Sequence, residues 1–432
     1  MTQNPSTPST YPPSYYADTA VGMQAHPQLT TETKCDVCIV GAGYTGLSAA
    51  LHLAKKGYRV VVLESQRVGW GASGRNGGQL GSTHRKTQHE LEHMLGKETA
   101  KGMWELAKES IATVKDIIDT YKIECDLTPG IIHAAWKKSD IEELEEEFDS
   151  LTNRYGYDQL EMLNRSHMRE QVDSTRYWAG LLDKGSAHLH PLNYALGLAR
   201  AAQSHGAQIY ENSAVTEITH TDPATVKTAT GTVTASHVLL ACNGYLGNLE
   251  KRVNGFIMPI NNFIIATEPL GKEQARALIR DNVAIADTKF VIDYYRLSTD
   301  NRLLFGGGEN YSPRFPKDIA NFVRKPMLRV FPQLKDTKID YAWGGTLALT
   351  LNRMPHFGHL KPNIVYAHGY SGQGINMATL GGKLAAEAIS GTAERFDMMA
   401  NVPIHKFPGG TLLRYPGMVA GMLFYALQDR LP

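Results

Sequence analysis

The chain has 432 residues, of which 42% are hydrophobic and 20% charged, a composition typical of a globular protein with a sizeable core. Its formal net charge of +1 gives no electrostatic basis for binding nucleic acid or an acidic partner. Its four scattered cysteines favour a reducing compartment, so we expect a cytoplasmic protein, and we see neither a signal peptide nor an apolar run long enough to span a bilayer.

Residues 1–34 are rich in Pro, Ser and Thr, which favours an extended N-terminal tail ahead of the core. Two neighbouring tyrosines, Tyr15 and Tyr16, could pack this tail onto the body of the protein or onto another subunit. An ordinary surface arm is the simpler interpretation.

Residues 35–64 carry the pattern strand, glycine-rich turn, helix, strand and acid. The pattern comprises an apolar run at Val37–Val40, a G-x-G-x-x-G spacing of Gly41, Gly43 and Gly46, helical periodicity over Leu47–Lys56, and a second apolar run at Arg59–Leu63 that ends in Glu64. Such glycines let the backbone approach a pyrophosphate, the helix N-terminus attracts its charge, and the acid accepts hydrogen bonds from a ribose hydroxyl. The unit predicts a dinucleotide site without distinguishing FAD from NAD, and its acid disfavours NADP.

A second glycine-rich stretch follows at Gly69–Gln79, with five glycines in eleven residues. Such a stretch cannot form a packed helix or strand. Its place directly after a dinucleotide unit favours a loop that lines the cofactor over a flexible surface loop, with Ser73, Arg75, Asn76 and Gln79 as its polar groups.

Two short patterns suggest metal or redox chemistry. Cys35 and Cys38 form C-x-x-C, but on the first predicted strand, which favours core packing. His89, Glu90 and His93 match the zinc signature H-E-x-x-H, and a helix would place both histidines on one face. Because no third ligand is apparent and the flanking helix is polar, we favour a solvated helix face and keep a zinc hydrolase as an alternative.

The middle of the chain is expected to interrupt the dinucleotide fold. We predict helices over 91–122, strands around a Pro-Gly turn within Cys125–Trp136, and an acidic helix over Asp140–Tyr155. His188 and His190 would point the same way on a strand, in a structural or substrate-facing role rather than as a metal pair.

Later segments are predicted to return to the dinucleotide fold and then to leave it again. A helix at Leu192–His205 and a buried strand at His237–Cys242 return to the first sheet, as in a doubly wound domain with an insertion. Strands at Phe256–Glu268, Phe290–Leu297 and Arg302–Gly307 suggest an antiparallel sheet. Alternation along the second of these places Tyr294 and Arg296 on one face and Tyr295 on the other.

The last predicted strand, Asn363–His368, leads into a glycine-rich turn and a helix that ends near Ile389. The positive N-terminus of that helix could stabilise negative charge on a reduced cofactor ring. An apolar run at Met418–Leu427 is too short to span a bilayer. It predicts a docked terminal helix, or a contact with a subunit or a membrane surface.

These motifs resemble the FAD-dependent D-amino-acid oxidase and glycine oxidase superfamily over nearly the whole chain. The resemblance is carried by DVCIVGAGYTGLSAALHLA at 36–54, GASGRNGGQ at 71–79, HLHPLN at 188–193, DYYRL at 293–297, RMPHFG at 353–358 and GYSGQG at 369–374. It implies an α/β fold of two domains followed by a C-terminal segment at 401–432. A Rossmann-like FAD-binding domain would be assembled from 35–90, 165–250 and 335–400, and a mixed-sheet substrate domain from 91–164 and 251–334.

The resemblance also implies which residues bind FAD. They lie in the first glycine turn, at the acid, in the second glycine-rich stretch, at two single positions, before the last strand and in the last glycine turn: Gly41, Ala42, Gly43, Tyr44, Thr45, Gly46, Glu64, Ser65, Ser73, Gly74, Arg75, Asn76, Gly77, Gly78, Gln79, Val215, Asn243, Gly344, Gly345, Gly369, Tyr370, Ser371, Gly372, Gln373, Gly374 and Ile375.

We expect this FAD to be non-covalent. No cysteine follows Cys242, which excludes the cysteinyl linkage of some sarcosine oxidases, and a histidyl linkage through His84 is the remaining alternative. The lysine with which some relatives activate oxygen has no counterpart in Arg302–Glu309.

The implied reaction is oxidation of a small-molecule amine: a hydride passes to flavin, water hydrolyses the iminium to an aldehyde, and dioxygen becomes hydrogen peroxide. Candidate pocket residues are Tyr294, Tyr295, Arg296, His190 and Trp343, with Arg296 or Arg75 as the anchor for a remote carboxylate. The alternatives are a D-amino-acid or N-methylamino-acid dehydrogenase that reduces a quinone, the zinc hydrolase, and a flavin-binding protein without turnover.

Overall fold

The first sheet is built on the predicted strand–helix–strand unit. A computed structural model describes residues 10–310, 314–417 and 419. In it, β1 (Glu32–Val40) pairs in parallel with β2 (Val60–Leu63) and β10 (Thr232–Leu240), and α2 (Tyr44–Lys55) connects β1 to β2. The strand order is β16-β17-β10-β1-β2-β7, with β9 on β10 and β8 on β9. The remaining strands of this sheet are β7 (Gln208–Tyr210), β8 (Val215–Ile218), β9 (Ala224–Thr228), β16 (His356–Lys361) and β17 (Ile364–His368).

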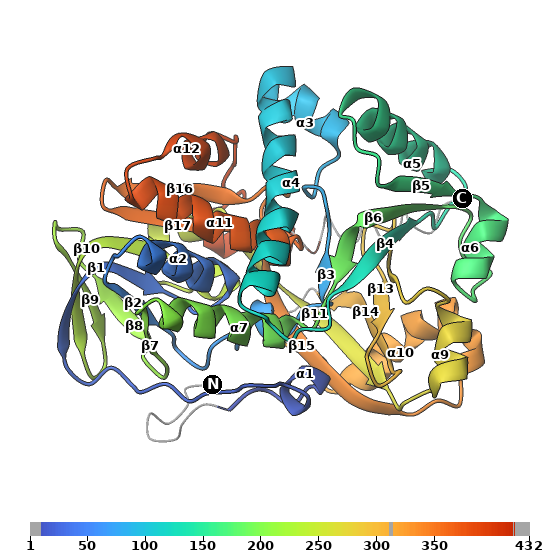
Figure 1. Ribbon diagram of the computed structural model, residues 1–432, viewed down its shortest axis with the longest axis horizontal. Coiled ribbons are helices and arrows are strands. Elements are labelled where there is room, and N and C mark those ends of the chain that lie inside the picture. The colour runs from blue at the N-terminus through green and yellow to red at the C-terminus, as the bar shows by residue number, and fades with distance from the viewer. Residues whose placement is uncertain (1–9, 311–313, 418, 420–432) are drawn as a thin grey trace.

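The second sheet is mixed and lies beside the first (Figure 1). Its order is β15-β11-β14-β13-β12-β4-β6-β3, with β5 paired to β6. Its strands are β3 (Gln79–Leu80), β4 (Thr128–Ala134), β5 (Leu160–Leu163), β6 (Gly180–His188), β11 (Met258–Thr267), β12 (Ala284–Asp287), β13 (Tyr294–Leu297), β14 (Leu303–Asn310) and β15 (Ile339–Leu349). The strands β15, β11, β14 and β13 are antiparallel, as predicted.

Helices cover both sheets (Figure 1). Helices α2, α7 and α11 pack on one face of the first sheet, α4 packs on α7 and α11, and α9 and α10 pack on the second sheet. The bounds of the other α-helices are α1 (Tyr15–Asp18), α3 (Gln88–Leu95), α4 (Lys97–Thr120), α5 (Asp140–Asp149), α6 (Arg165–Gln171), α7 (Pro191–Ser204), α8 (Lys251–Asn254), α9 (Lys272–Leu278), α10 (Ile319–Val330), α11 (Gly374–Ile389) and α12 (Glu394–Ala400). Short 3-10 turns occupy η1 (Ala72–Gly74), η3 (Asn243–Tyr245) and η4 (Pro332–Leu334), and η2 (Ser150–Arg154) is π-helical.

Two features of the chain differ from the sequence prediction. The predicted turn at Pro129 and Gly130 is wrong, because both residues lie inside the single strand β4. There the pairing with β6 shifts register between Pro129 and Ile131, and this bulge accommodates the proline and the positive φ of Gly130. In addition, β6 and β15 join the second sheet although they fall in segments predicted for the FAD domain. The domain boundaries themselves stay a prediction.

The N-terminal segment is docked rather than free. From residue 10 it runs along the body, and α1 lies beneath the junction of α7 and the second sheet (Figure 1). Tyr15 and Tyr16 are both buried, and β1 already begins at Glu32. The favoured prediction of an ordinary surface arm is therefore wrong for this part of the segment, and the alternative, packing of the two tyrosines onto the body, is the arrangement found.

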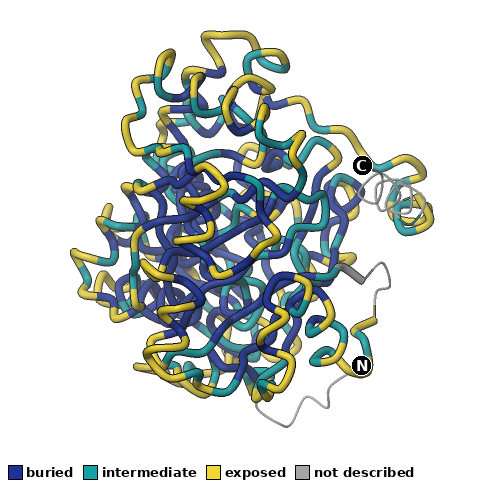
Figure 2. The backbone as a smooth tube through the Cα atoms, turned by 90° about the vertical axis from the view of Figure 1, so that its right-hand side faces the viewer, coloured by how far each residue is buried: buried dark blue, intermediate teal, exposed yellow. Residues whose placement is uncertain are grey.

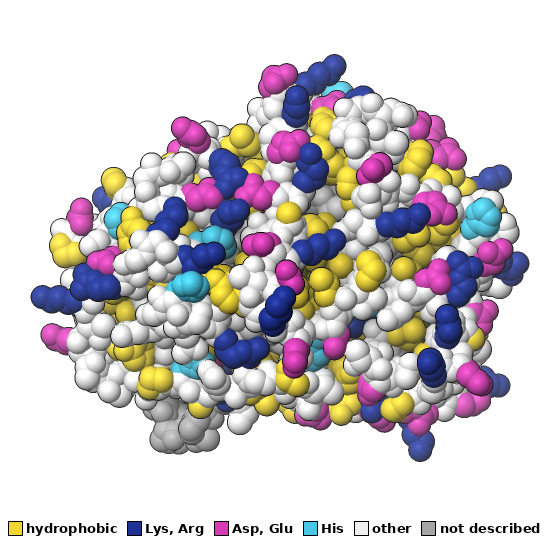
Figure 3. Space-filling view, viewed as in Figure 1, with side chains coloured by type: hydrophobic (Ala, Val, Ile, Leu, Met, Phe, Trp, Pro, Cys, Tyr) yellow, Lys and Arg dark blue, Asp and Glu magenta, His cyan; other side chains and the backbone are white. Residues whose placement is uncertain are grey.

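The burial pattern agrees with the composition. Buried segments fill the interior and exposed ones lie at the periphery (Figure 2). Cys35 and Cys38 are buried, unpaired residues of β1, as predicted from their place on a core strand. On the face shown in Figure 3, basic and acidic side chains are interspersed. Within the described residues, none of the helices has the length and hydropathy needed to cross a membrane, and Met418–Leu427 lies outside them apart from position 419.

Candidate active site

Three turns meet at the carboxyl edge of the first sheet. The register aligns Val40 of β1 with Leu240 of β10, and Leu240 with Tyr366 of β17, so the turns that follow these strands gather at one edge. The first two turns touch, since a Cβ on Gly41 would lie 2.8 Å from the carbonyl oxygen of Ala241. The edge is the place where open α/β sheets bind their ligands.

The first turn has the close approach that a pyrophosphate requires. A Cβ on Gly46 would lie 1.9 Å from the carbonyl oxygen of Gly41, and one on Gly43 would lie 2.9 Å from Oγ of Ser73. Gly43 caps α2 without a side-chain hydrogen bond, and the amide of Tyr44 donates to Oγ of Ser73 at 3.1 Å. The N-terminus of α2 and the second glycine-rich stretch therefore lie together, as an anion site needs.

Glu64, the acid predicted to bind a ribose, lies at the end of β2 beside the first glycine turn. Its carboxylate accepts hydrogen bonds from the amides of Ala42 (2.8 Å) and Gln66 (2.9 Å) and from the hydroxyl of Ser65 (3.1 Å). The amide of Ser213 donates to the carbonyl oxygen of Glu64 at 2.8 Å, which brings the start of β8, and hence Val215, to the end of β2.

The stretch from Gly69 to Gln79, hereafter the cofactor loop, holds a buried cation. Arg75 is 8% exposed, and its guanidinium donates from Nε to the carbonyl oxygen of Trp70 (2.7 Å) and from Nη1 to that of Gly344 (3.1 Å). Its Nη2 is buried without a hydrogen-bond partner among the described residues. Burial lowers the pKa of Arg75, with a smaller opposing effect of Tyr245. A buried guanidinium with one unused donor fits an anionic group of a dinucleotide.

The last glycine turn joins the same place. The amide of Gly369 donates to Oδ1 of Asn243 at 2.9 Å, and the hydroxyl of Tyr370 lies 2.7 Å from that of Thr45. α11 begins at Gly374 without a side-chain cap, and a Cβ on Gly382 would lie 2.3 Å from the carbonyl oxygen of Thr45. The two helices are thus in backbone contact, and neither N-cap residue makes a side-chain hydrogen bond to its helix. Apart from the Tyr44 amide, which bonds Ser73, their N-terminal amides can donate to a negative group. The residues present fit a bound dinucleotide.

The candidate pocket residues separate into two faces, as alternation predicts. Tyr294 covers the cofactor loop: a Cβ on Gly77 would lie 2.4 Å from its ring, and its hydroxyl donates to Oδ1 of Asn262 at 2.5 Å. Arg296 lies on the same face, with Nε donating to the carbonyl oxygen of Gly77 at 3.0 Å. Tyr295 points the other way and stacks on Phe305 at 5.3 Å within the second core.

His190 and Trp343 are buried behind the cofactor loop. His190 caps α7 rather than lying on a strand, so it does not share a strand face with His188. Burial and the charge of Arg296 lower the pKa of His190 to about 3, which keeps the imidazole neutral. The indole of Trp343 donates to the carbonyl oxygen of Arg75 at 3.1 Å. Trp343 therefore contacts the loop directly, whereas His190 contacts the start of α7.

The H-E-x-x-H pattern does not form a three-ligand metal site. His89 and His93 do share a helix face, with their Nε2 atoms 3.2 Å apart, but Glu90 closes the capping box of α3 with Thr87. No group of three or more His, Cys, Asp or Glu side chains with metal-binding geometry occurs in the described part of the chain.

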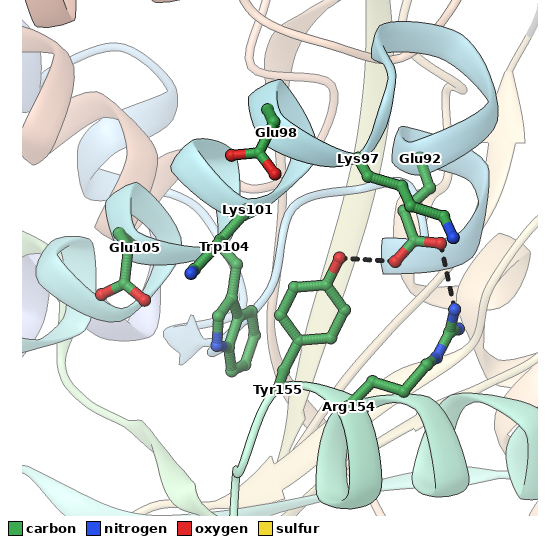
Figure 4. Close-up of a pocket in the computed structure, with 8 residues that line it drawn as sticks. All are labelled: Glu92, Lys97, Glu98, Lys101, Trp104, Glu105, Arg154 and Tyr155. Carbon is green, nitrogen blue, oxygen red and sulfur yellow. Dashed lines mark hydrogen bonds and ion pairs between the residues drawn. The ribbon is translucent and has the colours of Figure 1, made fainter.

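A surface groove of about 330 Å³ lies between α4 and the residues after α5 (Figure 4). Its lining consists of Glu92, Lys97, Glu98, Lys101, Trp104, Glu105, Arg154 and Tyr155. Inside it, Glu92 accepts hydrogen bonds from Arg154 and Tyr155, so these three side chains are paired with one another. The groove contains none of the residues predicted for FAD.

Sequence reasoning missed two residues of this region. Asn262 fixes the hydroxyl of Tyr294, and its position on β11 carried no motif. No sequence motif marks Tyr16 as a residue of this region, yet its ring centre lies 5.2 Å from that of Trp343 and 4.9 Å from that of His190. The pair of adjacent tyrosines was the only available signal.

Comparison with known proteins agrees with this geometry. The family model described as FAD dependent oxidoreductase (DAO) matches residues 36–388, so the chain belongs to this family of FAD-dependent oxidoreductases. It is 46% identical over 419 residues to gamma-glutamylputrescine oxidoreductase of Escherichia coli (strain K12), covering 97% of this chain and 98% of the relative. It is 39% identical over 422 residues to the probable oxidoreductase OrdL of Haemophilus influenzae, covering 96% and 97%.

The crystal structure of glycine oxidase from Geobacillus kaustophilus has the same fold, with a TM-score of 0.73 at 21% identity, over 87% of this chain and 100% of that chain. The predicted fold class, the FAD cofactor and the assignment as an oxidoreductase are thereby confirmed. The contacts of individual residues with FAD stay predictions.

Proposed function

We propose that the protein oxidises gamma-glutamylputrescine to gamma-glutamyl-aminobutyraldehyde in the breakdown of putrescine. The observation that carries this proposal is the 46% identity to gamma-glutamylputrescine oxidoreductase over nearly the full length of both chains. In the balanced reaction the amine, dioxygen and water give the aldehyde, ammonia and hydrogen peroxide. FAD, when bound, supplies the two-electron acceptor.

The protein's own groups would bind and orient this substrate. We assign the ring of Tyr294, which Asn262 fixes and which covers Gly77, as a wall of the pocket beside the cofactor loop. Of the two arginines predicted to anchor the remote carboxylate, Arg296 already uses Nε, Nη1 and Nη2 on neutral oxygen atoms. Arg75 retains an unused buried donor, which makes it the better supported cation for a negative group.

We further propose that FAD is held without a covalent bond and that the enzyme works in the cytoplasm. His84, the alternative attachment point, is buried against α4, where its Nε2 lies 2.9 Å from the carbonyl oxygen of Met103. The four cysteines are all free, as is usual in a reducing compartment.

Anaerobic reduction of the purified holoenzyme tests the proposed substrate. Gamma-glutamylputrescine should bleach the visible flavin band, whereas putrescine, sarcosine and D-alanine should leave it unchanged at equal concentration. Admission of air should restore the band and release one hydrogen peroxide per aldehyde. Bleaching by sarcosine or D-alanine instead would mean that the proposed substrate is wrong. Bleaching that a quinone reverses and air does not would mean that the electron acceptor is a quinone rather than dioxygen.

A further inference from the structure

The N-terminal segment contacts the start of the cofactor loop and the side chains that hold its second part. At the start of the loop, the hydroxyl of Tyr11 donates to the carbonyl oxygen of Val68 at 2.7 Å, and the indole of Trp70 donates to the carbonyl oxygen of Thr10 at 3.1 Å. Toward the end of the loop, the fully buried Tyr16 contacts Arg296 and Trp343, the side chains that donate to the loop, rather than the loop itself. Residues 10–16 therefore lie along the loop rather than elsewhere on the surface.

Tyr16 contacts the two side chains that hold this second part of the loop. Arg296 donates from Nε to the carbonyl oxygen of Gly77 (3.0 Å) and from Nη2 to the hydroxyl of Tyr16 (3.3 Å). Trp343 donates to the carbonyl oxygen of Arg75 (3.1 Å), and its ring meets that of Tyr16 edge to face at 5.2 Å. One tyrosine thus fixes the orientation of both donors.

The segment is itself attached to both halves of the molecule. Thr19 places its hydroxyl 3.0 Å from Nε2 of His190, and the amide of Val21 donates to Asn193 in the first turn of α7 at 2.9 Å. Tyr15 instead reaches the second sheet, where its hydroxyl donates to Asp300 at 2.8 Å. Tyr15 is buried as well, but the hydroxyl of Tyr15 bonds outside the set of groups that hold the loop.

We propose that Tyr16 is a positioning residue for FAD, acting through Arg296 and Trp343 to hold the cofactor loop in its binding conformation. The physical reason is preorganisation: a loop with five glycines loses much conformational freedom when it binds a ligand, unless the fold has already ordered it. The proposal rests on the assignment of residues 69–79 to the cofactor and goes beyond it by giving the N-terminal segment a role in FAD binding.

The test is titration of the full-length apoprotein with FAD, followed by flavin fluorescence. Tyr16→Ala should raise the dissociation constant about tenfold or more, and Tyr16→Phe, which keeps the ring against Trp343, should recover most of that loss. The matched control is Tyr15→Ala on the same short helix, which removes a similar buried ring and should change FAD affinity less than about threefold. Circular dichroism of the bound flavin at saturating FAD should change for Tyr16→Ala and not for Tyr15→Ala.

Two further variants keep the result decisive. If Tyr16→Ala does not fold, Tyr16→Phe combined with Tyr11→Phe removes the hydroxyls with which the N-terminal segment bonds Arg296 and Val68, and it should raise the dissociation constant about threefold to tenfold. Asn76→Ala breaks the loop from inside, because Asn76 bonds Ala72, Ser73 and Gly78. If Asn76→Ala weakens FAD binding and the Tyr16 variants do not, the proposal for Tyr16 is overturned while the assignment of the loop to FAD stands. No effect of either overturns the assignment of the loop, and equal effects of Tyr15→Ala and Tyr16→Ala overturn the specific role of Tyr16.

Discussion

The Nε of Arg296 donates to the carbonyl oxygen of Gly77 at 3.0 Å, which joins a strand of the second sheet to the cofactor loop. Arg296 is 3% exposed, and its other donors meet the carbonyl oxygen of Leu297 and the hydroxyl of Tyr16. A guanidinium that is committed to the backbone of a loop determines where that loop lies. Three of its five N–H donors are then committed to neutral oxygen atoms of the protein.

We therefore expect Arg296→Lys to weaken FAD binding about tenfold, because a lysine ammonium cannot reproduce the planar set of donors. At saturating FAD the KM for the amine should change by less than about twofold. Arg302→Lys is the control, since Arg302 bonds Asp300 and Asp340 instead of the loop. A large rise in KM with unchanged FAD affinity would show that Arg296 holds the substrate.

Gly78→Ala should affect both stability and cofactor binding. Gly78 has a φ of +78°, and an added Cβ would lie 2.2 Å from the carbonyl oxygen of Leu189 and 2.9 Å from Nε of Arg296. We expect a loss of about 2–4 kcal/mol in the free energy of unfolding, from backbone strain and overpacking together. Urea unfolding of the apoprotein and FAD titration measure the two effects.

The matched control for this change is Gly57→Ala. Gly57 has a φ of +86°, but nothing lies within 4 Å of an added Cβ. It should lose only about 1 kcal/mol and keep its FAD affinity. Equal losses in the two variants would mean that the contact with Leu189 relaxes and that only backbone strain matters.

Tyr294→Ala should lower kcat/KM for gamma-glutamylputrescine about tenfold or more, because it removes the ring that covers Gly77 and Gly306. Its sequence neighbour gives the control. Tyr295→Phe keeps the stacking on Phe305 and loses only the hydrogen bond to Tyr177, so it should cost about 1 kcal/mol of stability and leave kinetics unchanged. Steady-state kinetics with saturating FAD distinguish the two faces, and an intact kcat/KM in Tyr294→Ala would remove this residue from the pocket.

Buried neutral histidines should make the protein sensitive to acid. Burial and the charge of Arg296 lower the pKa of His188 from 6.5 to about 3, and burial lowers that of His356 from 6.5 to about 4. Between those values the unfolded chain binds protons that the folded protein does not. The contribution of these two histidines to the free energy of unfolding should therefore be fully present above pH 6.5 and decrease as the pH falls toward 3, by up to about 1.4 kcal/mol per pH unit for each histidine.

His188→Gln tests the contribution of one histidine. The glutamine amide can still donate to the carbonyl oxygen of Asn282, which Nε2 of His188 approaches at 2.7 Å. Urea unfolding across this pH range should give a shallower decline for the variant than for the parent protein. Identical slopes would mean that His188 titrates normally.

The local chemistry of the glycine turns and strands was predictable, whereas the long-range contacts were not. The spacing of Gly41, Gly43, Gly46 and Glu64 requires one geometry, and the structure has it. Alternation correctly separated Tyr294 from Tyr295, but it could not say which face met the cofactor loop, since that depends on β3 pairing with β6. The predicted turn at Pro129 and Gly130 was wrong because local sequence was misleading there. A Pro-Gly pair usually indicates a turn, and only the pairing of β4 with β6 makes it a bulge within a strand.

The strand order has a consequence for biosynthesis. The sheet that carries the first glycine turn is completed only by β10 and β17, and the uncapped helix that follows β17 begins at Gly374 of a 432-residue chain. Contacts between residues so distant in sequence form late, and proteins that depend on them fold slowly. All residues up to Gly374 must therefore leave the ribosome before the three turns meet at the carboxyl edge of the sheet, so acquisition of FAD follows the synthesis of these residues instead of guiding it.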